Sequence, residues 1–247
     1  MKPIAILNNG SIRRMPKAFY QACGGDLDVL FSAASQRPLA DFVHIDVEGG
    51  ATLPDAGDLS GVILTGSAAM VTDRHPWAEA EAAWVRRQRG HLPMLGVCFG
   101  HQLLTHALGG VVDWTPSGPE YGTIDITLTD AARGDPLFAG VPLVFKAQSA
   151  HSQIATVLPA DAQLLAVNAI GIQAARFDEQ IWGLQFHPEF AAPMMLGLFE
   201  AYRATYIERG FNVDGLIAAV RDTTLASSII AAFAAICGRR GTQDVAQ

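Results

Sequence analysis

One cysteine with a glycine at each second neighbour constrains the fold of this chain more than any other feature. It lies in the stretch Gly96-Val97-Cys98-Phe99-Gly100. Residues 92–97 form a short apolar run typical of a buried strand in a parallel sheet, and residues 99–108 repeat apolar side chains at helical spacing. Glycine at both flanks relieves the crowding of Cβ atoms where a strand turns at once into a helix. The pattern therefore predicts a strand–turn–helix with Cys98 at the turn.

The predicted turn would place Cys98 where a thiol becomes reactive. It directs the side chain out at the carboxyl end of the strand and at the amino end of the helix, where the helix dipole favours thiolate over thiol. A lone cysteine in an apolar run is more often a small buried hydrophobic residue. A structural cysteine, however, requires neither Gly96 nor Gly100, so we predict that Cys98 is a nucleophile.

A histidine and a glutamate farther along the chain supply the partners that a cysteine nucleophile requires. Residues 181–186 are predicted as an apolar strand, which leads directly into His187-Pro188-Glu189. Pro188 biases His187 toward an extended backbone, in which side chains two residues apart point the same way. Glu189 can then orient the imidazole of His187 in a Cys–His–acid arrangement. Most isolated triplets of this kind are surface turns, so the separate nucleophile turn is what favours the catalytic interpretation.

These two stretches resemble the motifs of a known family. Gly-Val-Cys-Phe-Gly-His-Gln-Leu-Leu at residues 96–104 is similar to the nucleophile motif of class I glutamine amidotransferases. Trp-Gly-Leu-Gln-Phe-His-Pro-Glu-Phe at residues 182–190 is similar to that family's His/Glu motif. The likeness extends from about Ile4 to Phe190 and is greatest to free-standing members related to the glutaminase domain of GMP synthase. The resemblance implies catalytic roles for Cys98, His187 and Glu189.

The same resemblance implies further site residues. Gly66 begins a Gly-Ser turn after a predicted strand, and its N–H, with that of Phe99, would hold the oxyanion of a tetrahedral intermediate. Gln102, one turn into the helix, would contact the substrate. The family's Ser-His segment, which grips the α-amino and α-carboxyl groups of glutamine, corresponds to the predicted loop that contains Ser149, Ala150 and His151. By position alone, Gly66 is equally an ordinary loop glycine, and His151 a loop histidine satisfied by backbone groups.

The resemblance implies a reaction as well as a site. The protein would hydrolyse the side-chain amide of L-glutamine through a γ-glutamyl thioester and release ammonia for an acceptor. The sequence contains no Gly-x-x-x-x-Gly-Lys loop of an ATP-binding synthetase. Either a separate synthetase subunit supplies the acceptor site, or the protein hydrolyses free glutamine or another γ-glutamyl compound. A non-catalytic regulatory or binding module is expected to lack part of the triad, whereas all three residues are present.

Composition narrows the class of protein and its partners. The chain has 247 residues, 50% hydrophobic and 17% charged, which suits one large α/β domain. Its formal net charge is -7 and it has no basic run, so we expect no nucleic acid and no membrane as a partner. Cys23, Cys98 and Cys237 are far apart and odd in number, which argues for a reducing compartment. We expect a cytoplasmic protein with no signal peptide and no cofactor, and the sequence has no Cys-x-x-Cys or His-x-x-x-His spacing of a metal site.

Alternating strands and helices predict an α/β fold, a three-layer sandwich with a largely parallel central sheet of the flavodoxin-like type that the resemblance implies. We expect residues 1–192 to form the amidotransferase domain and residues 193–247 a C-terminal helical extension packed on it. Leu198 and Tyr202 belong to a helical stripe expected in the core. The helices of the extension would either pack on the domain or form a homodimer surface, and residues 239–247 are expected to be a frayed tail.

Overall fold

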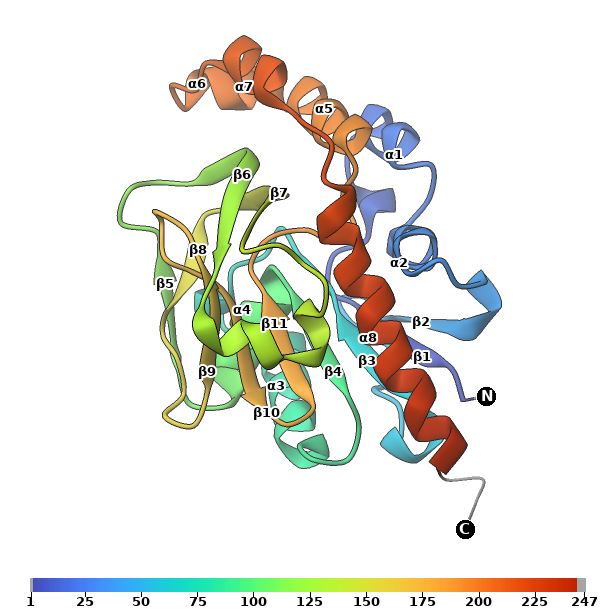
Figure 1. The fold of residues 1–247 in the computed structure, drawn as a ribbon. Coiled ribbons are helices and arrows are strands. Elements are labelled where there is room, and N and C mark those ends of the chain that lie inside the picture. The colour runs from blue at the N-terminus through green and yellow to red at the C-terminus, as the bar shows by residue number, and fades with distance from the viewer. Residues whose placement is uncertain (1, 244–247) are drawn as a thin grey trace.

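One mixed sheet runs through the centre of the molecule (Figure 1). The computed structural model describes residues 2–243, with side chains up to residue 239. In this part of the chain the central sheet has nine strands. Their spatial order is β2 (Phe42–Asp46), β1 (Ile4–Asn8), β3 (Gly61–Leu64), β4 (Met94–Val97), β11 (Ile181–Leu184), β10 (Ile172–Asp178), β9 (Gln163–Val167), β6 (Glu120–Leu128) and β7 (Val144–His151).

The sheet has a parallel part and an antiparallel part. The strands from β2 to β11 in that order are parallel to their neighbours, and β10, β9, β6 and β7 continue the sheet in antiparallel pairs. A separate antiparallel pair, β5 (Val111–Trp114) with β8 (Gln153–Val157), flanks it. The parallel part contains β4 and β11, so the strands that lead to the two sequence motifs are direct neighbours.

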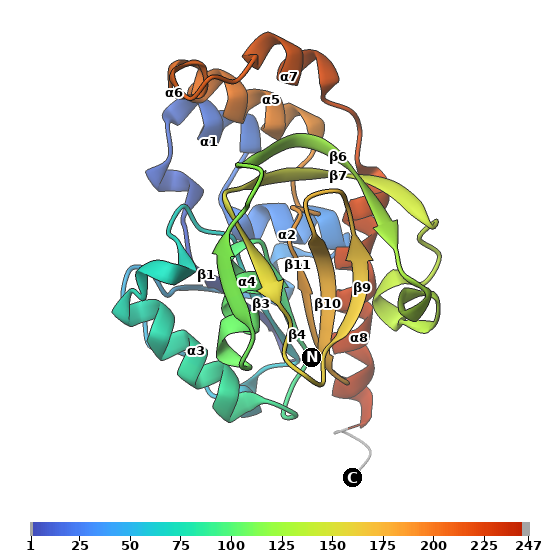
Figure 2. The same cartoon turned by 90° about the vertical axis from the view of Figure 1, so that its left-hand side faces the viewer.

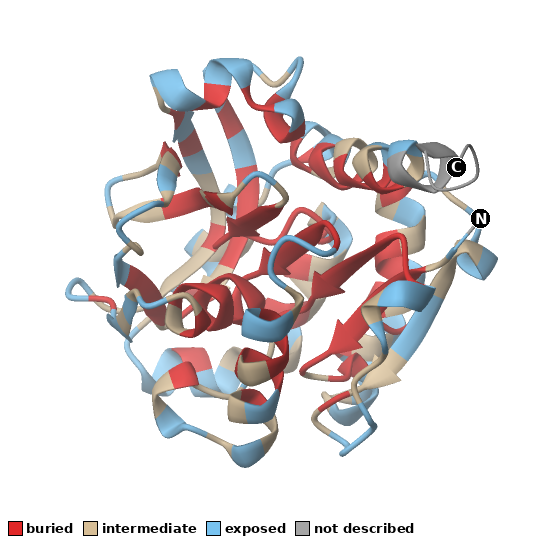
Figure 3. Ribbon diagram, turned by 90° about the horizontal axis from the view of Figure 1, so that it is seen from below, coloured by how far each residue is buried: buried red, intermediate tan, exposed pale blue. Residues whose placement is uncertain are grey.

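The parallel strands are buried on both faces, as expected for a sheet covered by helices on each side. In β1, Ile4 and Ile6 pack into one core cluster, whereas Ala5 and Leu7 pack into the other. Figure 3 shows the buried residues gathered in the central strands and in the helices packed against them. Because side chains alternate along a strand, one continuous apolar run serves two hydrophobic cores.

Helices cover both faces of this sheet. On one face lie α3 (Pro76–Gln88) and α4 (Phe99–Ala107), which contribute to the same core cluster. On the other face lie α1 (Lys17–Cys23), α2 (Leu27–Ser35) and α8 (Thr224–Gln243). In Figures 1 and 2, α8 runs the length of the sheet beside α2. The predicted three-layer α/β fold with a parallel central part is confirmed.

Three further helices gather with α1 at one end of the sheet (Figure 1). They are α5 (Ala192–Ala201), α6 (Arg203–Glu208) and α7 (Val213–Ala219). α5 packs closely on α1, because a Cβ at Gly197 would lie 2.4 Å from the Cβ of Ala22. A small residue at that point lets the two helices approach, which holds α5 beside α1 at this end of the sheet. The division of the chain at residue 192 into a domain and an extension stays a prediction.

Two segments differ from the sequence-based expectation. Residues 148–151, expected in a loop, form the end of β7, because they pair with β6 from Glu120 to Thr123. The tail expected from residue 239 is wrong as far as Gln243, because α8 continues to that residue, and residues 244–247 lie outside the described part. α2 was not predicted at all. It begins after Asp26, whose carboxylate accepts from the N–H of Leu27 and caps the helix.

Among residues 2–243, no single helix combines the length and the apolar composition needed to cross a bilayer. One pair of helices, α7 with residues 224–239, meets that criterion when the two are taken together, but they are bent by 67° relative to each other.

Candidate active site

Cys98 lies at the turn between β4 and α4, as the sequence predicts. Its backbone has a positive φ of 52° with ψ of -105°, a conformation that is strained for any residue with a side chain. The flanking glycines are required by space. A Cβ at Gly96 would lie 2.5 Å from the carbonyl carbon of Gly100, and one at Gly100 would lie 2.2 Å from the carbonyl oxygen of Leu64. The close packing of β3, β4 and α4 therefore holds the nucleophile turn in its strained form.

His187 and Glu189 form a buried pair beside this turn. The Nδ1–H of His187 donates to Oε1 of Glu189 at 2.7 Å. The backbone N–H of His187 donates to the carbonyl of Gln148 at 2.8 Å, which ties the motif to the end of β7. Pro188 and Glu189 form a turn rather than an extended segment, yet the predicted contact between the two side chains is confirmed. The imidazole also stacks on the ring of Phe190, with centroids 4.4 Å apart.

The electrostatics of this pair favour a cationic histidine. Burial by itself lowers the pKa of the imidazole, but the carboxylate of Glu189 and the sulfur of Cys98 outweigh it and raise the pKa of His187 from 6.5 to about 10. An imidazolium next to a sulfur at a helix N-terminus stabilises negative charge on that sulfur. The arrangement therefore places a cationic imidazole beside the nucleophile.

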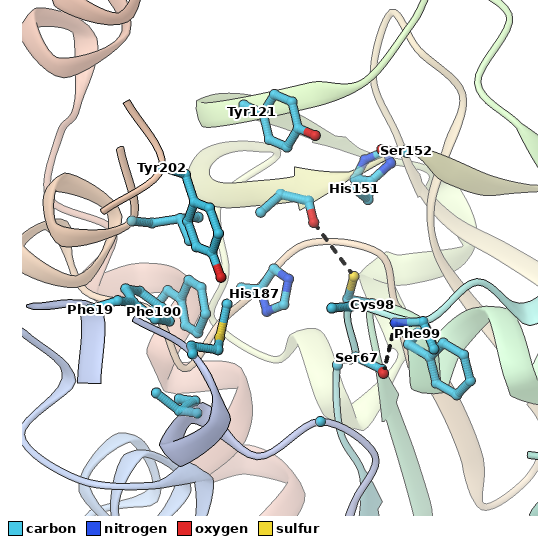
Figure 4. Close-up of a pocket in the computed structure, with 18 of the residues that line it drawn as sticks. Phe19, Ser67, Cys98, Phe99, Tyr121, His151, Ser152, His187, Phe190 and Tyr202 are labelled. Carbon is cyan, nitrogen blue, oxygen red and sulfur yellow. Dashed lines mark hydrogen bonds between the residues drawn. The ribbon is translucent and has the colours of Figure 1, made fainter. Parts of the chain in front are cut away.

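Cys98 and His187 lie beside each other in the cavity wall (Figure 4), and Gly66 lies close to both. A Cβ at Gly66 would lie 3.0 Å from Cε1 of His187 and 3.7 Å from the Cβ of Cys98. The Cys98 thiol points toward the carbonyl oxygen of Ala150, at 3.9 Å. Phe99 is the first residue of α4, where backbone N–H groups have no partner within the helix. Gly66 and Phe99 both line the cavity, so their proposed role as oxyanion donors stays consistent with their positions.

The predicted substrate-binding residues divide into two groups. Gln102, Ala150 and His151 line the cavity. The amide nitrogen of Gln102 donates to the carbonyl of Gln153 at 2.8 Å. Ser149 does not line the cavity, since its side chain is directed to the carboxylate of Glu120 at 3.1 Å. The structure therefore brings three of these four residues to the cavity, and Ser149 lies one layer behind it.

Glu120 is a residue that the sequence did not single out. Its carboxylate accepts from Nε2 of His151 at 2.9 Å and from the side chains of Ser149, Asn168 and Gln173. Burial raises the pKa of Glu120, but the hydrogen bond and charge of His151 outweigh it, so the net shift is downward. The partners come from β7, β10 and the loop before β10, and only the folded sheet brings them together. This carboxylate holds the strand end that carries Ala150 and His151 against the cavity.

A cavity of about 370 Å³ opens in front of these residues. Its wall includes Leu198 of α5, Tyr206 of α6 and, between these helices, Tyr202. Leu198 and Tyr202 were expected in the core stripe. Leu198 does pack in the core, yet both side chains also face the cavity because α5 and α6 lie across it.

The fold and the two motifs define the class of protein, and the chain belongs to the class I glutamine amidotransferase family. The family model for "Glutamine amidotransferase class-I" matches residues 40–194.

Individual relatives are similar to this chain over part of their length. GMP synthase [glutamine-hydrolyzing] of Thermomicrobium roseum is 37% identical over 131 residues, covering 53% of this chain and 23% of the relative. One subunit of the GMP synthase [glutamine-hydrolyzing] of Methanococcus maripaludis strain C5 is 41% identical over 100 residues, covering 40% of this chain and 51% of the relative. The chain thus spans about a quarter to a half of the length of these curated relatives.

Solved structures share the fold over almost the whole chain. A glutamine amidotransferase of Thermotoga maritima has a TM-score of 0.72 and 18% identity, covering 95% of this chain and 97% of that one. A glutamine amido transferase of Methylobacillus flagellatus has a TM-score of 0.70 and 21% identity, covering 97% and 95%. At this identity the likeness establishes the architecture alone, including the helices beyond residue 192.

Proposed function

We propose that this protein hydrolyses a γ-glutamyl amide bond, with the side-chain amide of L-glutamine as the parent substrate. The observation that carries the proposal is the meeting of Cys98, His187 and Glu189 in one cavity. Glu189 bonds one ring nitrogen of His187, and the sulfur of Cys98 lies nearby. This is the arrangement in which an acid orients a base and the base serves a nucleophile. The relatives described as glutamine-hydrolyzing support the same acyl group.

In the first half-reaction, the sulfur of Cys98 attacks the carbonyl carbon of the amide. The N–H groups of Gly66 and Phe99 hold the oxyanion of the tetrahedral intermediate. As the intermediate collapses, the C–N bond breaks and His187 gives its proton to the leaving nitrogen. With glutamine the leaving group is ammonia, and a γ-glutamyl thioester remains on Cys98.

In the second half-reaction, water attacks the thioester carbon and gives a proton to His187, which is now neutral. The C–S bond breaks, glutamate leaves, and the thiolate–imidazolium pair is restored. Glu189 remains ionised throughout, because its part is to hold Nδ1 of His187 and thereby direct Nε2 toward the reacting atoms.

We further propose that the ammonia is used at an acceptor site on a separate synthetase subunit. The support is the Methanococcus maripaludis relative, which is itself one subunit of a GMP synthase. The second candidate is hydrolysis of a γ-glutamyl compound other than glutamine. The two candidate substrates share the γ-glutamyl half and the residues that bind it, and they differ only in the leaving amine. The part of the cavity that receives the leaving group therefore discriminates between them.

The test uses ammonia release from L-glutamine and labelling by a diazo-ketone analogue of glutamine. We expect the analogue to modify Cys98, while Cys23 and Cys237, which do not line the cavity, serve as internal controls. Cys98→Ala should reduce amide hydrolysis by about 10³-fold or more with the fold retained. Hydrolysis by this variant at the wild-type rate would refute Cys98 as the nucleophile. Labelling without ammonia release would favour a required partner or a different γ-glutamyl substrate.

A further inference from the structure

The cavity is large for a reaction whose leaving group is ammonia. Its volume of about 370 Å³ lies in the range of sites that enclose whole small molecules, about 300–1,000 Å³. Ammonia is close in size to a water molecule, which occupies about 30 Å³ in the liquid. The γ-glutamyl half of the substrate takes up part of this volume, and the cavity extends from Cys98 to Tyr206 and Arg209, which leaves room for a leaving amine that carries a substituent.

The direction in which that substituent would extend follows from His187. Because Glu189 holds Nδ1 of the ring, Nε2 is the atom that protonates the leaving nitrogen. In Figure 4, Cys98 and Phe99 lie on one side of the imidazole, and Phe190 and Tyr202 lie on the other. The acyl half of the substrate belongs beside Cys98, so the amine half must extend past His187 toward these rings.

Both rings belong to an aromatic wall of the cavity. It consists of Tyr121, Phe190, Tyr202 and Tyr206. The rings of Tyr121 and Tyr206 meet edge to face with centroids 4.8 Å apart, and Phe190 is held by its stack on His187. Tyr121 and Tyr202 are half-buried and present accessible ring surface. Because the wall is already packed, an apolar group can bind to it without first ordering these side chains.

The charges around the cavity favour a neutral or anionic amine over a cationic one. Burial raises the pKa of both Tyr202 and Tyr206, so their hydroxyls stay neutral. Glu189, the carboxylate among the lining residues, is engaged with His187. The guanidinium of Arg209, exposed at the rim, has no ion pair within the described part of the chain. A polyamine would thus meet a cation and no free carboxylate.

We propose that the preferred substrate is a γ-glutamyl secondary amide whose nitrogen carries an aromatic or similarly bulky apolar group, bound against the aromatic wall. The inference rests on the proposed hydrolysis at Cys98 and specifies its leaving group. It selects the second candidate above, a γ-glutamyl compound other than glutamine, over delivery of ammonia to a synthetase subunit. The overall change is RCO–NHR′ + H₂O → RCOOH + R′NH₂, in which the C–N bond breaks, His187 supplies the proton to nitrogen, and water replaces it during hydrolysis of the thioester. No further co-reactant is needed.

The test compares γ-glutamyl benzylamide with γ-glutamyl methylamide, two secondary amides that differ in one phenyl ring. In the wild-type protein we expect kcat/KM to be about tenfold or more higher for the benzylamide, since burial of a ring of this size favours binding by that amount. Tyr202→Leu should lower this ratio severalfold, whereas Tyr202→Phe, which keeps the ring, should preserve it. The matched control is Tyr20→Leu, a half-buried tyrosine of α1 that does not line the cavity, which should leave the ratio unchanged.

The outcomes separate this inference from the proposed function. A ratio near one in the wild-type protein, or a ratio that Tyr202→Leu leaves unchanged, overturns the aromatic leaving group while Cys98-dependent hydrolysis of glutamine still stands. Hydrolysis of glutamine without cleavage of either secondary amide also overturns it. If Cys98→Ala hydrolyses glutamine, the benzylamide and the methylamide at the wild-type rates, both the proposed function and this inference are overturned.

Discussion

Nδ1 of His187 lies 2.7 Å from Oε1 of Glu189, and this contact joins a side chain at the cavity to one that is almost fully buried. A carboxylate can only accept, so the contact assigns the proton of Nδ1 and leaves Nε2 to face the reacting atoms. It also raises the pKa of His187, as described above. The catalytic proposal depends on this relationship more than on any other contact.

Glu189→Gln should impair the action of His187 without unfolding the protein. The amide keeps the shape of the side chain but removes the charge that sustains the imidazolium, so we expect kcat to fall by about 10²–10⁴-fold. Circular dichroism and the urea midpoint report on the fold, and amide hydrolysis reports on the reaction. The matched control is Glu179→Gln, in the turn between β10 and β11, which should hydrolyse substrate like the wild type. A Glu189→Gln variant with undiminished kcat would exclude the proposed role of the carboxylate.

Gly66→Ala should impair catalysis by crowding. The added Cβ would lie 3.0 Å from Cε1 of His187, so the imidazole or the loop must shift by a few tenths of an ångström. We expect kcat/KM to fall by about tenfold or more, because a displaced imidazole or oxyanion donor weakens transition-state stabilisation. Gly134→Ala is the control, since its Cβ would meet nothing within 4 Å. Equal activity of the two variants would mean that residue 66 lies outside the reacting geometry.

Glu120→Gln tests the carboxylate that holds the end of β7. Losing the charge-assisted bond to His151 should destabilise the fold by about 1–3 kcal/mol and raise KM more than it lowers kcat. The folded-state pKa of Glu120 is lowered, so its stabilisation is present above the unfolded pKa and is lost as pH falls. The stability difference between wild type and variant should therefore shrink in acid, as measured by urea unfolding. Asp125→Asn, an exposed carboxylate on the same strand, is the control and should show a smaller effect.

Glu81→Gln tests a second buried carboxylate, on α3. Burial raises the pKa of Glu81 to about 8, and the side chain of Asn9 donates to it at 3.3 Å. Between pH 4.5 and about 8 the folded state holds a proton that the unfolded state has released, so the stability of the wild type falls as pH rises. The expected slope from this group is about 1.4 kcal/mol per pH unit. Glu81→Gln should lack this slope, so it should gain stability relative to wild type from pH 5 to pH 8. Parallel stability curves for the two proteins over this range would contradict the assignment.

Local patterns explain why much of this molecule was predictable. The turn at Cys98 is encoded within five residues, since only glycine fits where Gly96 and Gly100 pack against neighbouring backbone. The contact of His187 with Glu189 is encoded within a segment of three residues. Similar local patterns predicted β4, α4 and β11 near their observed bounds. By contrast, residues 148–151 were expected in a loop because their strand conformation comes from pairing with β6 rather than from apolar alternation.

By itself, the sequence determined the nucleophile turn, the His–Glu pair and the α/β class, because each depends on short-range sterics or on the period of apolar side chains. Only the tertiary structure decided what surrounds them: the carboxylate of Glu120 with its partners from distant segments, and an aromatic wall built from β6, α6 and the residues that flank α5. A helical stripe such as Leu198 with Tyr202 has the same spacing whether it meets a core or a cavity. Which of the two it meets depends on how α5 and α6 pack beside α1 and α7 at the end of the sheet, and long-range packing leaves no mark in the local sequence.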